Sequence, residues 1–159
     1  MKIDKITQFI HDRFPAQPAV YAHCDGPCGV YDPASARITA EAVLSMTKKI
    51  LDLHPPTAGD VKAMANYENT ISRYIQIKEE QAQTTKSELL LLWTDYFKPQ
   101  HLEQFPNLHD TFWKAAKLCS ACKVEVSVQH AEELMVAIEE IHNIFWTTKH
   151  REVAWVRAS

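Results

Sequence analysis

Residues 23–33 read HCDGPCGVYDP and place one imidazole and two thiols, those of His23, Cys24 and Cys28, close together in the chain. Asp32-Pro33 then supplies a helix N-cap followed by a proline at the first helical position. Imidazole nitrogens and thiolate sulfurs are ligands that transition metals prefer. The stretch therefore predicts a metal-binding hook that leads directly into the first helix of the fold.

The segment before the hook has the features of a removable pro-segment. Val20-Tyr21-Ala22 resembles a peptidase cleavage site, with small or apolar residues one and three positions before His23. Residues 1–22 carry charged side chains and lack the continuous apolar stretch of a secretory signal peptide. We therefore expect two parts, a pro-segment over residues 1–22 and one domain over residues 23–159.

Cleavage before His23 changes the chemistry of the hook, because it creates a free α-amine. That amine, the backbone nitrogen of Cys24 and the sulfurs of Cys24 and Cys28 can form a square of two nitrogens and two sulfurs around one ion. Ni²⁺ and Cu²⁺ favour such square-planar fields. The ring of His23 remains as an axial fifth ligand, so the predicted metal ligands are His23, Cys24 and Cys28.

Apolar residues at helical spacing predict four helices after the hook. They cover residues 33–53, 58–97, 106–123 and 128–150, and short connections favour an all-α, up-and-down four-helix bundle that carries the N-terminal hook. The polar stretch 78–86 is expected to be exposed or to face another subunit. The expected inward residues are Ile38, Ala42, Met46, Ile50 and Leu53, then Val61, Met64, Ile71, Ile75, Leu89, Leu92 and Tyr96, then Leu108, Phe112, Ala115, Cys119 and Cys122, and finally Leu134, Ile138, Ile141 and Phe145.

Three segments resemble the nickel-containing superoxide dismutases, in the order in which that family has them. They are HCDGPCGVYDP at residues 23–33, LWTDYFKP at 92–99 and IFWTTK at 144–149. The resemblance implies one nickel ion per subunit and disproportionation of superoxide to dioxygen and hydrogen peroxide through Ni(III)/Ni(II) cycling, after cleavage before His23. It also implies a processing peptidase and assembly as a homohexamer.

The resemblance assigns four more site residues. Tyr31 matches a tyrosine that lies over the open face of the metal, and Asp25 matches an aspartate that ties the hook to its surroundings. Tyr96 and Lys98 match residues at the mouth of the site. Lys98 would supply local positive charge for anionic superoxide, because the chain as a whole has a formal net charge of −3.

Two positions depart from the family pattern. Thr39 and Gln81 stand where the family has a glutamate and an arginine that together orient the axial imidazole. We expect Thr39 and Gln81, or water, to orient the ring of His23 through neutral hydrogen bonds instead.

Composition argues against other partners and locations. The acidic net charge does not suit nucleic acid. No run of about 20 apolar residues predicts a membrane span. The lack of a secretory signal and the unpaired thiols favour the cytoplasm.

Three alternatives use the same residues. The hook could belong to a non-enzymatic nickel- or copper-binding protein, the chain could be an uncleaved precursor whose bundle serves only in assembly, or all four cysteines could hold a structural zinc ion. Cys119 and Cys122 form a C-x-x-C motif that could be a redox pair, but their place on an apolar stripe favours buried core thiols.

The sequence leaves two features less defined. Histidines on loops and polar faces are expected to be solvated or to cap helices; they are His54, His101, His109, His130, His142 and His150. The tail 151–159 extends beyond the last matching segment and could either dock on a neighbour or fray.

Overall fold

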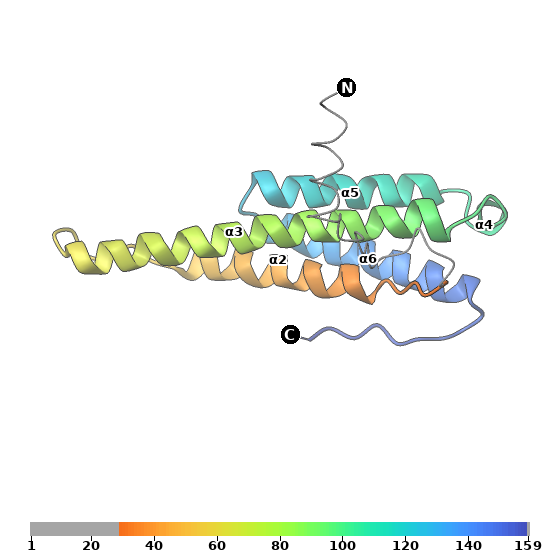
Figure 1. Cartoon of the computed structure of the whole chain (residues 1–159), viewed down its shortest axis with the longest axis horizontal. Helices are drawn as coiled ribbons and strands as arrows, with labels where there is room; N and C mark the ends of the chain where they lie inside the picture. Colours follow the sequence, from red (N-terminus) through yellow and green to blue (C-terminus); the bar gives the residue numbers. More distant parts are fainter. Residues whose placement is uncertain (1–28, 159) are drawn as a thin grey trace, which may run out of the picture.

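The computed structural model describes residues 29–158, which form a bundle of four long helices (Figure 1). Each long helix contacts the next one along the chain, and the first also contacts the last. The elements are α2 (Ala34–Asp52), α3 (Val61–Leu91), a π-helical turn η1 (Leu92–Tyr96), α4 (His101–Gln104), α5 (Leu108–Val124) and α6 (Val128–Thr148). The predicted up-and-down four-helix bundle is confirmed, while the hook residues His23, Cys24, Asp25 and Cys28 lie outside the described residues.

Side-chain hydrogen bonds lie at three of the helix starts. The Oδ1 atom of Asp32 accepts a hydrogen bond from the N–H of Ala34 at 2.8 Å, and the N-cap of α2 is Pro33, one residue later than predicted. Asp60 caps α3 and Ser127 caps α6 through bonds to the third residue beyond each. The second helix therefore begins at Val61 rather than at residue 58.

The predicted inward faces of α5 and α6 are confirmed. Cys119 and Phe112 on α5, and Leu134 and Ile138 on α6, are all at most 1% exposed. The remaining predicted residues of these two faces are also buried; they are Leu108, Ala115, Cys122, Ile141 and Phe145.

The prediction for α2 is wrong in its orientation. Ile38 is 57% exposed, whereas Ala36, Ala40, Val43 and Leu44 are buried. The prediction followed the larger apolar residues, but small residues at this spacing let α2 pack closely against both α3 and α6. Of the expected stripe, Ile50 is buried, and the rest is exposed or half-buried.

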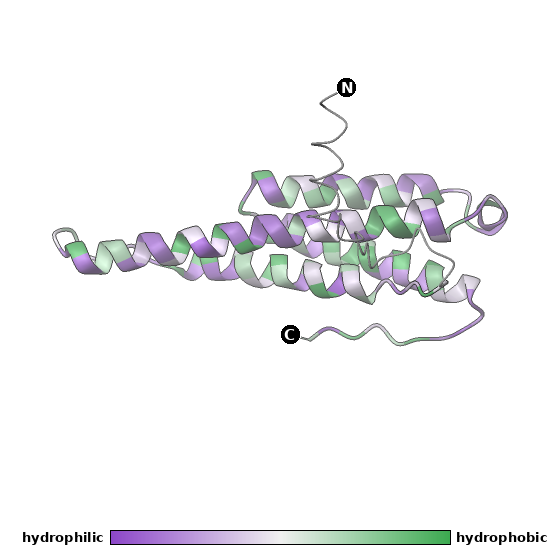
Figure 2. Ribbon diagram, in the orientation of Figure 1, coloured by the Kyte–Doolittle hydropathy of each residue, from purple (hydrophilic) through white to green (hydrophobic). Residues whose placement is uncertain are grey.

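The polar middle of α3 is exposed only in part: Glu80, Gln83 and Thr84 are exposed, whereas Lys78, Ala82 and Thr85 are buried. The ammonium of Lys78 donates to the backbone carbonyls of Lys123 at 3.1 Å and Glu125 at 3.3 Å, and also to that of Cys122. A cation is stabilised at these carbonyls, which end α5. Hydrophilic and hydrophobic residues alternate along α3 in Figure 2, so hydropathy alone does not outline its buried face.

The N-terminal part of α3 projects beyond α5 (Figure 1). In this part Val61 is 82% exposed and Ile75 is 40% exposed within the single chain. Their predicted burial is therefore wrong for the single chain. The reason is length: α3 has 31 residues and α5 only 17, so α5 does not cover the N-terminal part of α3.

The C-terminal tail docks on its own bundle and runs back beside it (Figure 1). The N–H of Ala158 donates to Glu41 on α2 at 2.7 Å, and Trp155 packs against the core. His142 donates from Nε2 to the carbonyl of Val153 at 2.8 Å. The expectation that His142 lies on a polar face is therefore wrong, since the tail covers it and leaves it 6% exposed.

None of the helices between residues 29 and 158 combines the length and the apolar character that a membrane span requires.

Candidate functional site

The two predicted tyrosines of the described chain meet at one end of the bundle. Tyr31 lies just before α2 and Tyr96 ends η1, and their ring centroids are 5.6 Å apart. Both line a pocket of about 360 Å³ together with Lys98. The resemblance predicted Lys98 at the mouth of the site. The remaining lining residues are Gly29, Asp95, Gln100 and His101. Because Cys28 precedes Gly29 by one peptide bond, the predicted hook adjoins this pocket in the chain.

Tyr96 is held in place from several sides. Its ring lies 4.5 Å from that of Phe145 and 4.9 Å from that of Phe97, measured between centroids. The hydroxyl of Thr148 donates to the carbonyl of Phe145, so the phenol of Tyr96 is the donor in its 2.6 Å bond to Thr148. This arrangement fixes the ring and directs the phenolic proton toward α6.

The π-helical turn places Tyr96 at the pocket. The N–H of Phe97 bonds to the carbonyl of Leu92, five residues earlier, instead of continuing the α-helical pattern. Such turns shift the side chains that follow relative to a regular helix and occur often at functional sites. Nothing in the spacing of LWTDYFKP signals this turn, and we expected a regular helix through Phe97.

Lys98 brings positive charge to the pocket wall, and a second lysine that is not among the lining residues lies near the ring of Tyr96. Lys98 is exposed at the pocket wall. The ammonium of Lys149, which the sequence reasoning did not single out, lies 5.0 Å from the centroid of the Tyr96 ring. Lys98 lies in the matching segment 92–99 and Lys149 in the matching segment 144–149. The resemblance could therefore have identified Lys149 as well.

His101 is a further pocket residue that sequence reasoning missed. Its ring stacks on that of Tyr96 with centroids 5.7 Å apart and planes 20° apart. Its Nδ1 accepts a hydrogen bond from the N–H of Lys98 at 3.1 Å. The expectation of a capping role is therefore correct, but the residue also lines the site.

Thr39 and Gln81 lie on facing helices of the α2–α3 seam. Thr39 accepts a hydrogen bond from Thr85 at 2.8 Å and donates to carbonyls of its own helix. Nearer to Tyr31 in the chain, Ser35 donates to the carboxylate of Glu88 at 2.7 Å. The seam thus contains polar pairs beside its buried apolar residues, and the predicted bond from Thr39 or Gln81 to His23 stays a prediction.

Cys119 and Cys122 are buried free thiols, as the apolar stripe predicts. Burial raises the pKa of Cys119 to about 12 and that of Cys122 to about 11, because a thiolate is poorly solvated in the core. Both are therefore protonated at neutral pH and supply no thiolate ligand. Within residues 29–158, no three histidine, cysteine or acidic side chains are grouped to hold a metal ion.

A larger groove of about 560 Å³ lies between α5 and α6. Its lining includes several carboxylates, such as those of Glu132, Glu133 and Glu140, and none of the predicted site residues. The aromatic pocket at Tyr31 and Tyr96 is therefore the candidate site.

Comparison with known proteins agrees with this geometry. Residues 18–149 match the family model of the nickel-containing superoxide dismutases. The chain is 40% identical over 139 residues to the superoxide dismutase [Ni] of Streptomyces seoulensis, covering 86% of this chain and 95% of that protein. It is 38% identical over 136 residues to the superoxide dismutase [Ni] of Streptomyces coelicolor, with the same coverage.

Solved structures agree as well. A native nickel superoxide dismutase superposes with a TM-score of 0.70 at 37% identity, covering 81% of this chain and 100% of that one. A nickel-containing superoxide dismutase with ligation of the oxidised state gives a TM-score of 0.68 at 40% identity, with the same coverage. The fold, the pocket and these matches together show that the chain belongs to the family of nickel-containing superoxide dismutases.

Proposed function

We propose that this superoxide dismutase holds one nickel ion per chain with His23, Cys24 and Cys28, after cleavage before His23. The donors would be the new α-amine, the Cys24 backbone nitrogen, the two thiolates and the imidazole of His23. When bound, nickel supplies one-electron exchange between Ni(III) and Ni(II), through which two superoxide ions and two protons become dioxygen and hydrogen peroxide.

The residues around the hook suit this ion. Two nitrogens and two thiolates match the square-planar preference of nickel. The described pocket wall carries Asp95 and His101 besides its tyrosines and lysine, and no group of three possible metal ligands is found within residues 29–158. In this proposal the hook, rather than the pocket wall, holds the metal.

The pocket residues take distinct roles in this proposal. Tyr31 faces the substrate and holds a proton at its phenol oxygen, while Tyr96 packs beside it with its own proton bonded to Thr148. Lys98 attracts the superoxide anion, and Asp25 anchors the hook. The aromatic entrance also limits access of peroxide to the thiolates, which it would oxidise.

The same proposal extends to assembly and processing. We assign a homohexamer in the cytoplasm, matured by a dedicated peptidase that removes residues 1–22. Apolar side chains on the projecting part of α3, including Val61 and Ile75, offer surface for subunit contacts. Free thiols at Cys119 and Cys122 are typical of a reducing compartment.

The observation that carries the proposal is the Tyr31–Tyr96 pocket, whose wall begins at Gly29, next to Cys28 in the chain. The test uses protein that begins at His23, together with its Cys24→Ser and Cys28→Ser variants. Nickel content and superoxide consumption should both fall to background in each variant, with unchanged helical circular dichroism.

Two results would count against it. Variants that keep one nickel per chain and full turnover would contradict the ligand assignment. Nickel binding without turnover by the unmodified protein would instead favour a non-enzymatic nickel-binding protein.

A further inference from the structure

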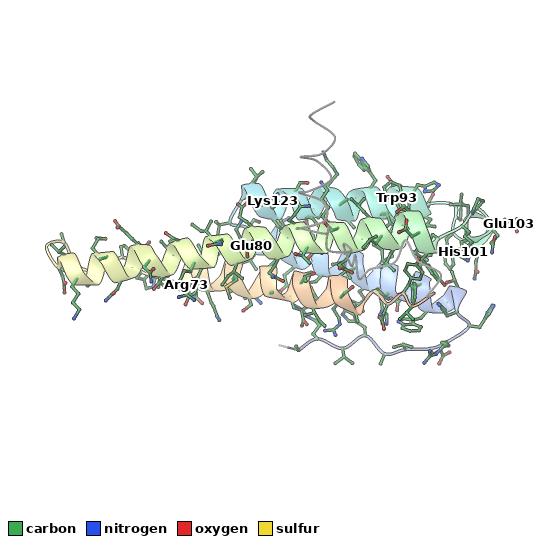
Figure 3. All side chains as sticks on the ribbon, viewed as in Figure 1. Arg73, Glu80, Trp93, His101, Glu103 and Lys123 are labelled. Carbon is green, nitrogen blue, oxygen red and sulfur yellow. The ribbon has the colours of Figure 1, made fainter. Side chains whose placement is uncertain are left out.

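The turn from Lys98 to His101 is closed by two hydrogen bonds. The N–H of Lys98 donates to Nδ1 of the His101 ring at 3.1 Å, and the N–H of His101 donates to the carbonyl of Lys98 at 2.9 Å. The first bond resembles one half of a capping box, because a side chain three residues on satisfies a backbone N–H that would otherwise lack a partner. Figure 3 shows His101 at the end of the bundle that holds the pocket, with Glu103 beyond it.

The same ring also contacts the aromatic residues of the site. It stacks on Tyr96 with the planes 20° apart and meets Phe97 edge-on at 86°. One half-buried imidazole therefore links the backbone of Lys98 with the ring of Tyr96. Because Nδ1 accepts a hydrogen bond, the proton of the neutral ring is on Nε2.

We propose that His101 is a positioning residue of the dismutase reaction, holding the backbone of Lys98 through Nδ1 and the plane of Tyr96 through its ring. The inference rests on the proposed function of this pocket. His101 acts through its two neighbours, and neither proton transfer nor metal binding is assigned to it.

The position of Lys98 matters because the whole chain repels the substrate. The formal net charge is −3, so attraction of superoxide depends on cations at the pocket. The Lys98 side chain is exposed and long, and the turn that His101 closes holds its backbone N–H. Release of this turn would leave the charge in the chain but move it away from the pocket.

Three substitutions separate the two contacts. His101→Phe keeps a ring for Tyr96 but lacks the acceptor for Lys98. His101→Asn keeps an acceptor at the position of Nδ1 but lacks the ring. His101→Leu is the matched control for asparagine, since leucine has the same branched shape but neither an acceptor for the N–H of Lys98 nor a ring for Tyr96.

The first measurement is the second-order rate constant for superoxide as a function of ionic strength, with protein that begins at His23 and carries nickel. His101→Phe and His101→Leu should lower the low-salt rate by about tenfold and flatten its salt dependence, since steering by charge is worth at least this much. His101→Asn should keep most of the salt dependence. Nickel content should be the same in all forms.

A double-mutant cycle with Lys98→Met shows whether the effect passes through the lysine. In the Lys98→Met background, His101→Phe should lower the rate by less than about twofold, because coupled residues are not additive. The inference would be overturned if the rate reduction of the double mutant equalled the product of the two single-mutant reductions. A wild-type salt dependence in His101→Phe would overturn it as well.

A third measurement does not depend on turnover. Hydrogen exchange at the Lys98 amide should be faster in His101→Phe and His101→Leu than in the wild type and His101→Asn. Equal exchange in all four proteins would overturn the inference. If the exchange responds as expected but the unmodified, nickel-loaded protein has no turnover, the proposed function fails and the positioning of Lys98 stands.

Discussion

The phenol of Tyr96 donates a hydrogen bond to the hydroxyl of Thr148 at 2.6 Å and so ties η1 to the last turn of α6. Thr148→Val keeps the shape of the side chain but removes this acceptor. Leaving the phenol without a partner should lower the free energy of unfolding by about 1–2 kcal/mol. Urea denaturation of the two proteins measures the difference.

Thr147 provides the matched control for this change. Its hydroxyl is exposed and bonds only to the carbonyl of Asn143 in its own helix. Thr147→Val should therefore change stability by less than about 0.5 kcal/mol, as is usual for surface substitutions. Equal losses at the two positions would show that the bond to Tyr96 contributes nothing.

Lys78 should be the costliest charge to remove from α3. Lys78→Met leaves the carbonyls of Lys123 and Glu125 without their buried donor, so the free energy of unfolding should fall by about 2–3 kcal/mol. Lys86→Met is the control, because Lys86 is half-buried and bonds to the single hydroxyl of Ser120. A smaller effect at Lys78 than at Lys86 in urea denaturation would refute the capping role.

The thiols of Cys119 and Cys122 should be inert in the folded protein. In a Cys24→Ser/Cys28→Ser background, a thiol reagent at pH 8 should label neither residue until denaturant unfolds the bundle. Burial and protonation are the reasons, since the thiolate is the reactive form. Labelling at the rate of a free thiol without denaturant would contradict the buried placement.

The same thiols should make stability depend on alkaline pH. Their folded pKa values of about 12 and about 11 lie above the ordinary value of 9.0, so above pH 9 the unfolded chain releases protons that the folded chain keeps. The contribution of the two protonated thiols to the free energy of unfolding is therefore fully present below pH 9 and is lost as the pH rises toward 11 and 12. A Cys119→Ala/Cys122→Ala variant should lose stability less steeply over this range, and an unchanged slope would contradict the assignment.

The tail should stabilise the bundle through Trp155. Its ring lies 5.3 Å from that of His142 and packs on the core, so Trp155→Ala should lower the free energy of unfolding by about 2 kcal/mol. Val156→Ala is the control, because Val156 is 62% exposed. Thermal unfolding compares the two, and equal midpoints would indicate that the tail does not hold to the bundle.

The fold was predictable where large apolar residues repeat at helical spacing. Phe112 and Cys119 on α5, and Ile138 and Phe145 on α6, follow that rule. In α2 the rule fails, because Ala36 and Ala40 face the neighbouring helices while Ile38 points outward. Small residues carry little hydropathy signal, although they permit the closest helix packing.

Lys78 shows a second limit of sequence reasoning. A lysine in a polar stretch predicts an exposed side chain, and only the position of the end of α5 reveals three carbonyls that bind its ammonium. His142 is similar, since its burial depends on a tail that folds back from residues 151–158. Contacts of this kind join distant segments and leave no local pattern.

Some residues of the site were predictable from the sequence and others were not. Tyr31, Tyr96 and Lys98 were predictable from the resemblance, and the pocket brings them together. His101 was not, because its role depends on a turn and a ring stack rather than on a motif. The assignments of His23, Cys24, Asp25 and Cys28 remain predictions.

The central claim is that nickel chemistry requires the free amine of His23. The most direct test compares protein that begins at His23 with the full-length chain, both incubated with nickel, by superoxide consumption and low-temperature EPR. The account predicts turnover and a rhombic Ni(III) signal with nitrogen hyperfine splitting in the shortened protein only. Equal activity in the two proteins would contradict it.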